Sequence, residues 1–205
     1  MSFINKIINT FISEKRKIYI YSGAGISAES GIQTFRGQNG LWNDHKVEDI
    51  CDFLSWENNY DQVHEFYNER RKQLANVKPN DCHYMIAKLQ KEFGVENVIN
   101  LTTNVDDLFE KAGVKNTIHL HGSLNEVKNM KTNEIYFLDN EEFEYKKEKR
   151  VFKPNVVFFN ERPYLYTYMA NNNYNMKDGD VVISIGMSFA ILKPERFIPQ
   201  DKDII

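Results

Sequence analysis

The chain has few cysteines, no long apolar run and almost no net charge, and each shortage argues against a class of protein. Its two cysteines, Cys51 and Cys82, are too few for a disulfide scaffold and too far apart for a C-x-x-C pair, so we expect a reducing, cytoplasmic location. No apolar run approaches the roughly 20 residues that a membrane helix needs. With 26 basic and 29 acidic residues, the net charge of -3 gives no electrostatic argument for a nucleic-acid or membrane partner.

The 205 residues, 41% of them hydrophobic, are enough for one well-cored domain, and the chain has no repeats and no long linker. Short apolar runs alternate with helical patterns, which predicts an α/β fold with a Rossmann-like, doubly wound parallel sheet. Residues 125–150 are rich in Lys, Glu and Asn and are expected to form an exposed excursion. The expected strands are 17–22, 98–101, 117–120, 156–159 and 181–186, and the expected helices are 58–76, 81–93 and 105–112.

A glycine-rich turn follows the first expected strand. Gly23-Ala24-Gly25 comes directly after an apolar run and leads into helix-compatible residues, a layout that aims backbone N–H groups at one point and suits a pyrophosphate. The third glycine falls at Gly31, so the spacing is not the G-x-G-x-x-G of an ordinary hydride-transfer dehydrogenase. A turn that serves only the fold explains the same residues, and the stretch alone leaves both interpretations open.

Polar residues also follow the later strands, and the carboxyl ends of parallel strands meet at one edge of a sheet. A neutral imidazole at His121 can take a proton near pH 7, and Asn104 can fix a sugar hydroxyl or a water. Asp106 can accept hydrogen bonds from an amide such as that of nicotinamide. Taken singly, Asn104 and Asp106 could be helix N-caps, His121 a structural histidine and Arg36 a surface ion pair. Their shared location favours a functional site.

Several motifs occur in an order that resembles the sirtuin family, over residues 18 to about 190. Many ordered motifs are far more specific than any one of them. They are G-A-G-I-S-A-E-S-G-I-x-x-F-R-G (Gly23 to Gly37), G-L-W (Gly40 to Trp42), T-x-N-V-D (Thr102 to Asp106), H-L-H-G-S (His119 to Ser123) and K-P-x-V-V-x-F (Lys153 to Phe159).

The resemblance implies an NAD-dependent protein-lysine deacylase, with NAD as a consumed co-substrate and acylated lysine side chains of proteins as partners. In that mechanism the acyl oxygen attacks the nicotinamide ribose and releases nicotinamide. His121, the general base, then helps a ribose hydroxyl to attack the resulting imidate, which leads to free lysine and acyl-ADP-ribose. The resemblance assigns NAD to Gly23, Ala24, Gly25, Glu29, Phe35, Arg36, Trp42, Thr103, Asn104, Val105, Asp106, Gly186, Met187 and Ser188.

A second stretch is similar to the bacterial and mitochondrial sirtuins that remove succinyl and malonyl groups. Their Y-x-x-R pair matches Tyr67 and Arg70, and residues three apart share a helix face, so both could reach one carboxylate. The alternative is an exposed arginine beside a core-facing tyrosine. In the family the peptide substrate adds as a strand near residues 156–161, which assigns Val157 and Phe159 to substrate binding.

The chain also departs from the family pattern. Asn129 and Thr132 stand where the first pair of zinc cysteines would fall, and residues 122–153 contain no cysteine, so no zinc or other metal is expected. Met187 places a bulky side chain near the expected adenine ribose. The chain stops at Ile205, so its C-terminus is shorter than usual. We expect one catalytic domain over residues 1–205, with small-lobe insertions at about 43–80 and 125–153.

These departures keep two other functions open. The first is an NAD glycohydrolase or ADP-ribosyltransferase, which would consume NAD without an acyl-lysine peptide. The second is a degenerate, non-catalytic NAD-binding protein, suggested by Met187 and the short C-terminus.

Overall fold

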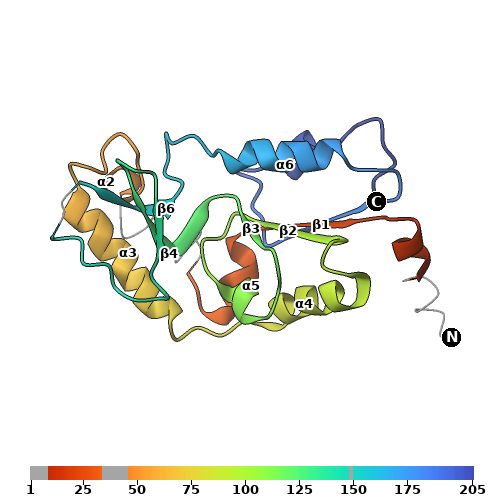
Figure 1. Cartoon of the computed structure of the whole chain (residues 1–205), viewed down its shortest axis with the longest axis horizontal. Helices are drawn as coiled ribbons and strands as arrows, with labels where there is room; N and C mark the ends of the chain where they lie inside the picture. The colour runs from red at the N-terminus through yellow and green to blue at the C-terminus, as the bar shows by residue number, and fades with distance from the viewer. Residues whose placement is uncertain (1–8, 34–45, 148–149) are drawn as a thin grey trace.

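The structure is a computed structural model that describes residues 9–33, 46–147 and 150–205. Its central sheet has four parallel strands in the order β3-β2-β1-β7. Figure 1 shows helix α6 on one side of this sheet and helices α4 and α5 on the other. The predicted α/β fold with a doubly wound parallel sheet is therefore confirmed. The strands are β1 (Ile18–Ser22), β2 (Val98–Thr102), β3 (Ile118–His119) and β7 (Val181–Ile185), and the helices are α4 (Asp81–Phe93), α5 (Leu108–Lys111) and α6 (Leu165–Tyr174).

Strand β1 is an inner strand of the parallel sheet, and both of its faces are buried and apolar. Successive side chains of a strand point to opposite faces. Ile18 and Ile20 pack in a cluster with residues of α4 and α5, while Tyr19 and Tyr21 pack in a second cluster with Met169 of α6. An apolar run with no polar alternation is typical of a strand covered on both sides.

Helix α4 has the bounds that the sequence predicts, because strong local signals set both ends. The Asn80 side chain accepts a hydrogen bond from the Cys82 backbone N–H at 3.0 Å, and the His83 ring pairs with the Asn80 backbone in a capping box. Gly94, with φ of 93°, ends the helix. His83 therefore has a structural role at the start of this helix.

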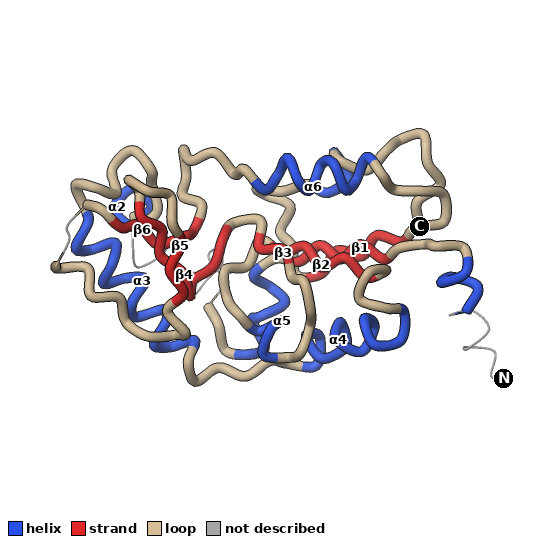
Figure 2. Tube along the Cα trace, viewed as in Figure 1, coloured by secondary structure: helices blue, strands red, loops and turns tan. Residues whose placement is uncertain are grey.

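A second sheet forms a small lobe with two helices, visible on the left of Figure 2. Its three antiparallel strands run in the order β5-β4-β6. The expected excursion over residues 125–150 belongs to this lobe: its described residues contribute the end of β4 and all of β5, and the rest are turn and loop. The elements of the small lobe are β4 (Gly122–Asn129), β5 (Ile135–Phe137), β6 (Phe152–Val156), α2 (Val47–Ile50) and α3 (Tyr60–Leu74). We call the parallel sheet with α4, α5 and α6 the body.

A polar turn connects β4 to β5 at the position where the family pattern would place the first cysteine pair. The side-chain oxygen of Asn129 accepts hydrogen bonds from the backbone N–H groups of Lys131 at 2.9 Å and Thr132 at 3.2 Å. The Thr132 hydroxyl donates to Glu134 at 2.9 Å. Asparagine is a favoured turn residue for this reason, and here it organises the turn through hydrogen bonds.

Three other elements differ from the sequence predictions. The strand expected over 156–159 lies earlier, as β6, and the helix expected over 105–112 is only the single turn α5. The difference is mainly at its start, because Asp107 is the N-cap residue and residues 105–107 precede the helix. Helix α6 was not predicted, because its sequence, LYTYMANNNY, contains three asparagines, which are poor helix formers. Two 3-10 helices, η1 (Ala24–Ser30) and η3 (Pro194–Arg196), complete the described elements.

Within the described ranges, no helix combines the length and the apolar character needed to cross a bilayer.

Candidate functional site

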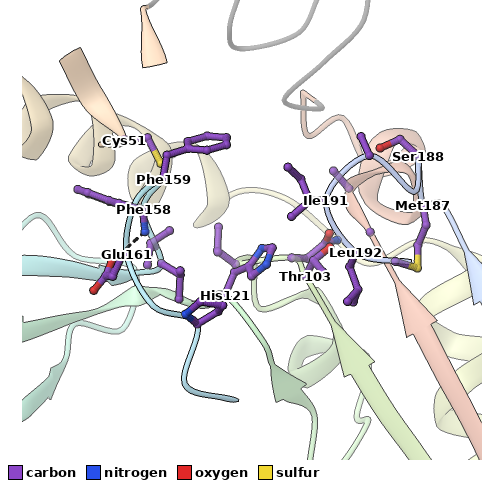
Figure 3. Close-up of a pocket in the computed structure, with 18 of the residues that line it drawn as sticks. Cys51, Thr103, His121, Phe158, Phe159, Glu161, Met187, Ser188, Ile191 and Leu192 are labelled. Carbon is purple, nitrogen blue, oxygen red and sulfur yellow. Dashed lines mark hydrogen bonds between the residues drawn. The ribbon is translucent and has the colours of Figure 1, made fainter. Parts of the chain in front are cut away.

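A cavity of about 580 Å³ opens beyond the carboxyl ends of β1 and β7. In the sheet, β1 lies between β2 and β7, so the strand order reverses direction at β1. Ligands of doubly wound sheets bind at such a topological switch point. Figure 3 shows His121 between two walls. One wall carries Phe158, Phe159 and Glu161 from the segment after β6, and the other carries the loop after β7, with Met187, Ser188, Ile191 and Leu192.

The glycine turn after β1 packs against the loop after β7. The N–H of Gly23 donates to the Ile185 carbonyl at 3.1 Å, and the N–H of Gly25 donates to the Gly186 carbonyl at 2.9 Å. A Cβ on Gly25 would lie 2.8 Å from the Gly186 Cα, which is too close for any side chain. The contact between the two loops therefore explains both glycines, and the turn lines the cavity as well.

Asn104 lies in the cavity wall, and only the nitrogen of its side-chain amide is hydrogen-bonded among the described residues. Its Nδ2 donates to the Ser27 hydroxyl at 3.0 Å, and its backbone N–H donates to the Thr102 hydroxyl at 3.0 Å. Its Oδ1 is buried and has no hydrogen-bond partner among the described residues. A buried acceptor without a partner costs about 1–3 kcal/mol, so a ligand hydroxyl that donates to it would gain that free energy.

Asp106 supports Asn104 from behind and does not line the cavity. Its carboxylate accepts hydrogen bonds from the Ser27 hydroxyl at 2.9 Å and from the Leu108 backbone N–H at 3.2 Å. Burial raises the pKa of this carboxyl, and the two hydrogen bonds oppose the rise. Ser27 thus connects Asp106 to Asn104, which fixes the orientation of the Asn104 amide.

His121 lies at the end of the short strand β3, directly before β4 begins. Burial lowers the pKa of its imidazole to about 4, although a backbone hydrogen bond with Thr103 favours protonation. His121 is therefore neutral at pH 7. In the tautomer whose other nitrogen donates to Thr103, Nε2 accepts from the Tyr166 hydroxyl at 2.7 Å, and the two rings stack. A neutral imidazole facing a cavity can act as a general base.

Tyr67 and Cys51 form a buried corner of the cavity. The Tyr67 hydroxyl donates to the Cys51 sulfur at 3.5 Å, and burial raises the pKa of both groups, so both are neutral at pH 7. Arg70 is elsewhere on α3. Its guanidinium lies 4.4 Å from the centre of the Phe66 ring and 3.5 Å from the Glu69 carboxylate, and it does not line the cavity.

The structure brings most of the predicted site residues together. Glu29 is exposed on η1, and with Asp106 and Arg70 it is not among the lining residues. Phe35, Arg36 and Trp42 lie outside the described residues. The predicted residues that line the cavity are Gly23, Ala24, Gly25, Tyr67, Thr103, Asn104, Val105, His121, Val157, Phe159, Gly186, Met187 and Ser188.

Sequence reasoning missed other lining residues. Phe158 and Glu161 could have been found, because they lie within and directly after a recognised motif. Cys51 belongs to no recognised motif. Tyr166 carried no signal, since its helix was not predicted. The loop from Phe189 to Leu192 has no motif, and it lines the cavity only because β7 pairs with β1.

In the part of the chain that the structure describes, no three His, Cys, Asp or Glu side chains gather closely enough to hold a metal ion.

Comparisons with known proteins agree with this geometry. Residues 23–193 match the Sir2 family. A protein of Pasteurella multocida named NAD-dependent protein deacylase is 37% identical over 194 residues, which cover 91% of this chain and 81% of that protein. A protein of the same name from Campylobacter jejuni is 39% identical over 181 residues, covering 86% and 76%.

Solved structures give the same result. A mutant Sir2 homologue in complex with ADP-ribose superposes with a TM-score of 0.77 at 29% identity, over 96% of this chain and 79% of that chain. A Sir2 homologue in complex with NAD gives a TM-score of 0.74 at 30% identity, over 96% and 77%. The chain belongs to the Sir2 family.

Proposed function

We propose that the protein is an NAD-dependent protein deacylase that removes acyl groups from lysine side chains and releases nicotinamide and acyl-ADP-ribose. The observation that carries the proposal is the neutral, buried imidazole of His121 in a cavity beside the glycine turn. The names of the relatives and the NAD and ADP-ribose complexes of the similar structures support it.

The residues of this chain would act on the ribose of NAD. Asn104 Oδ1, which has no partner among the described residues, would accept a hydrogen bond from a ribose hydroxyl. His121 Nε2 would take the proton of a ribose hydroxyl as its oxygen attacks the acyl group, after nicotinamide has left. A positioned general base contributes about 10²–10⁴-fold to such a step. For this transfer the ribose hydroxyl must take the place of the Tyr166 hydroxyl at Nε2.

Mass spectrometry of NAD incubated with acetyl-lysine and succinyl-lysine peptides tests the proposal. We expect nicotinamide release that requires an acylated peptide, together with deacylated peptide and acyl-ADP-ribose. His121→Ala should lower the yield of deacylated peptide at least about 100-fold. Nicotinamide release that is equal with and without peptide would instead identify an NAD glycohydrolase or ADP-ribosyltransferase. No binding of millimolar NAD in a thermal-shift measurement would identify a non-catalytic protein.

For the acyl group, we propose that the corner of Tyr67 and Cys51 receives the end of the acyl chain. A preference for succinyl or malonyl groups also requires a cation, and Arg70 must leave the Phe66 ring to supply it. The ratio of succinyl to acetyl turnover in the wild type and in Arg70→Met decides this. A ratio that falls at least tenfold in Arg70→Met supports the desuccinylase-type preference, and an unchanged ratio would show that Arg70 does not bind the acyl group.

A further inference from the structure

His119 lies behind the cavity wall and is hydrogen-bonded to the backbone of Asn104. Its ring does not line the cavity, and its side chain is 17% exposed. Nδ1 of His119 lies 2.8 Å from the Asn104 carbonyl oxygen, and Nε2 lies 3.2 Å from a carboxylate oxygen of Glu110 on α5. A carbonyl oxygen can only accept a hydrogen bond, so Nδ1 carries a proton and donates it. His119 therefore connects α5 to the residue that we assign to the ribose of NAD.

The geometry selects one protonation state of His119. Both ring nitrogens face an acceptor, and only an imidazolium has two N–H groups to donate. Burial lowers the pKa of His119, but the carboxylates of Glu110 and, more weakly, Asp106 raise it, so that it lies above the usual 6.5. Burial raises the pKa of Glu110, but the hydrogen bond with His119 and its charge lower it overall, so Glu110 is ionised at pH 7.

His119 completes a set of hydrogen bonds around Asn104 that leaves one atom available. The Asn104 backbone N–H donates to the Thr102 hydroxyl and its Nδ2 donates to the Ser27 hydroxyl, while its carbonyl accepts from His119. Oδ1 is buried and has no partner among the described residues. These three bonds hold the backbone and the side-chain amide at once, so Oδ1 has a fixed position in the cavity wall.

Stability gives little reason for the pair of His119 and Glu110. The Glu110 side chain is 46% exposed, and ion pairs that reach solvent contribute little to folding. The pair does fix the rotation of the ring, because a ring turned by half a rotation would present carbon atoms to both acceptors. Glu110 therefore keeps Nδ1 directed at the Asn104 carbonyl.

We propose that His119 and Glu110 are positioning residues: the His119 imidazolium, held by Glu110, fixes Asn104 so that its Oδ1 accepts a hydroxyl of the nicotinamide ribose of NAD. This inference rests on the proposed role of Asn104 at that ribose. As the pH rises through the pKa of His119, Nε2 loses its proton and its lone pair faces the Glu110 carboxylate, so the ring is no longer held. The affinity for the ribose is therefore greatest while His119 is charged and falls at higher pH.

Two ligands that differ by this ribose test the proposal without turnover. ADP-ribose is NAD without nicotinamide, and ADP lacks the ribose as well, so calorimetry with both separates the ribose from the rest of the site. At pH 6.5, His119→Ala should raise the Kd for ADP-ribose about tenfold, the effect of losing one hydrogen bond. It should leave the Kd for ADP within about twofold of wild type. His119→Asn, whose amide nitrogen can donate in place of Nδ1, should bring the Kd for ADP-ribose back to within about threefold of wild type.

The pH dependence of binding isolates the role of Glu110. The wild-type Kd for ADP-ribose should rise at least about threefold between pH 6.5 and pH 9, as His119 loses its charge. Glu110→Gln should abolish this rise, because an amide can donate to the unprotonated Nε2 and so holds the neutral ring as well. Glu92→Gln is the matched control. It removes an exposed carboxylate from the neighbouring helix α4 and should keep the wild-type pH dependence.

Each other outcome overturns the proposal. An equal rise of both Kd values in His119→Ala would show a general structural role, and an unchanged Kd for ADP-ribose would show that His119 does not act on the ribose. No recovery in His119→Asn, or a pH dependence that persists in Glu110→Gln, would show that the donated proton or the pair has no such role. A wild-type protein that does not bind ADP-ribose also contradicts it. A failure of the deacylase function gives a different pattern, in which ADP-ribose binds as described but acyl-lysine peptide causes no nicotinamide release.

Discussion

The core beneath β1 and the core of the small lobe are built from different side chains. The cluster between β1 and α4 contains aliphatic residues and one phenylalanine. The small lobe instead buries His64 among aromatic rings, with Tyr60 at 4.4 Å and Tyr145 stacked at 5.2 Å between ring centres. It also buries the cations Arg71 and Lys153. The first core depends mainly on the packing of apolar side chains, whereas the second depends also on buried cations, hydrogen bonds and the neutral form of His64, and therefore on pH.

Arg71 illustrates the difference. Its guanidinium is fully buried and donates to the Leu124 carbonyl at 3.0 Å and to the Asn68 side chain at 2.6 Å. No carboxylate within the described ranges pairs with it. Burial lowers its pKa to about 10, so it remains charged at pH 7. The small lobe thus retains an arginine that connects α3 to β4 through hydrogen bonds.

The largest expected effect is on the aliphatic core. Ile20 is fully buried in β1, so Ile20→Ala should lower the free energy of unfolding by about 4 kcal/mol, from lost burial and the cavity that remains. Urea unfolding followed by circular dichroism measures this. Ile135→Ala, at a side chain that is 50% exposed, is the control. A loss below about 1 kcal/mol at Ile20 would mean that this core can collapse around the gap, and the contrast with the small-lobe core would not hold.

The second effect is the pH dependence of the small lobe. Burial lowers the pKa of His64 to about 4 in the folded protein, against 6.5 for the free side chain. The stability that its neutral form contributes is fully present above pH 6.5 and is lost as the pH falls toward 4. The loss should reach about 3 kcal/mol. Urea unfolding at pH 7 and pH 4.5 should show a smaller difference for His64→Gln than for wild type, and equal differences would contradict the assignment.

The third effect comes from Arg71. Arg71→Met should cost about 2 kcal/mol, because the Leu124 carbonyl loses the guanidinium donor and the Asn68 oxygen keeps only the Phe143 N–H, while the desolvation of a charge is relieved. Lys72→Met is the neighbouring control. Lys72 forms an exposed ion pair with Glu142 at 3.4 Å, and its loss should cost no more than about 0.5 kcal/mol. Equal losses of stability in thermal unfolding at the two positions would show that the buried guanidinium has no special role.

The smallest effect is expected where the body meets the small lobe, at His121. The Tyr166 hydroxyl is hydrogen-bonded to Nε2 of His121, the atom that we propose accepts the ribose proton. Tyr166→Phe removes this competitor and should lower the KM for NAD by about three- to tenfold, the effect of one hydrogen bond. Tyr168→Phe, on the same helix and 49% exposed, should leave the KM unchanged. An increased KM in Tyr166→Phe would show that the hydroxyl assists NAD binding.

The body could be predicted from the sequence because its signals are local. Strands β1, β2 and β7 are short apolar runs, and α4 carries its own cap at Asn80 and its stop at Gly94. His121, Asn104 and the glycine turn were found because each begins within two residues of a strand end, and a parallel sheet brings strand ends to one edge. Most of the predicted cavity lining follows from this one rule.

The small lobe was harder to predict because its order comes from distant contacts. Strand β4 pairs with β6, and Asn125 and Lys128 of β4 give the strand the composition of a loop. The structural requirement for glycine at position 25 could not be predicted from the sequence either, because its close contact is with Gly186, far along the chain. Arg70 does not line the cavity although Tyr67 does, because helical spacing fixes a shared face but not where the side chain ends.

Gly122 follows His121 at the point where the chain enters the small lobe. Its φ is 82°, and a Cβ there would lie 1.9 Å from the Asn155 carbonyl oxygen of β6. Any side chain would push β4 away from β6 and would displace His121 with them. In a screen of random variants for lost activity, changes at Gly122 would therefore score as though a reacting group had been removed. Mutational scanning would therefore identify Gly122 as essential, although its role is only to be small enough for β4 and β6 to approach each other.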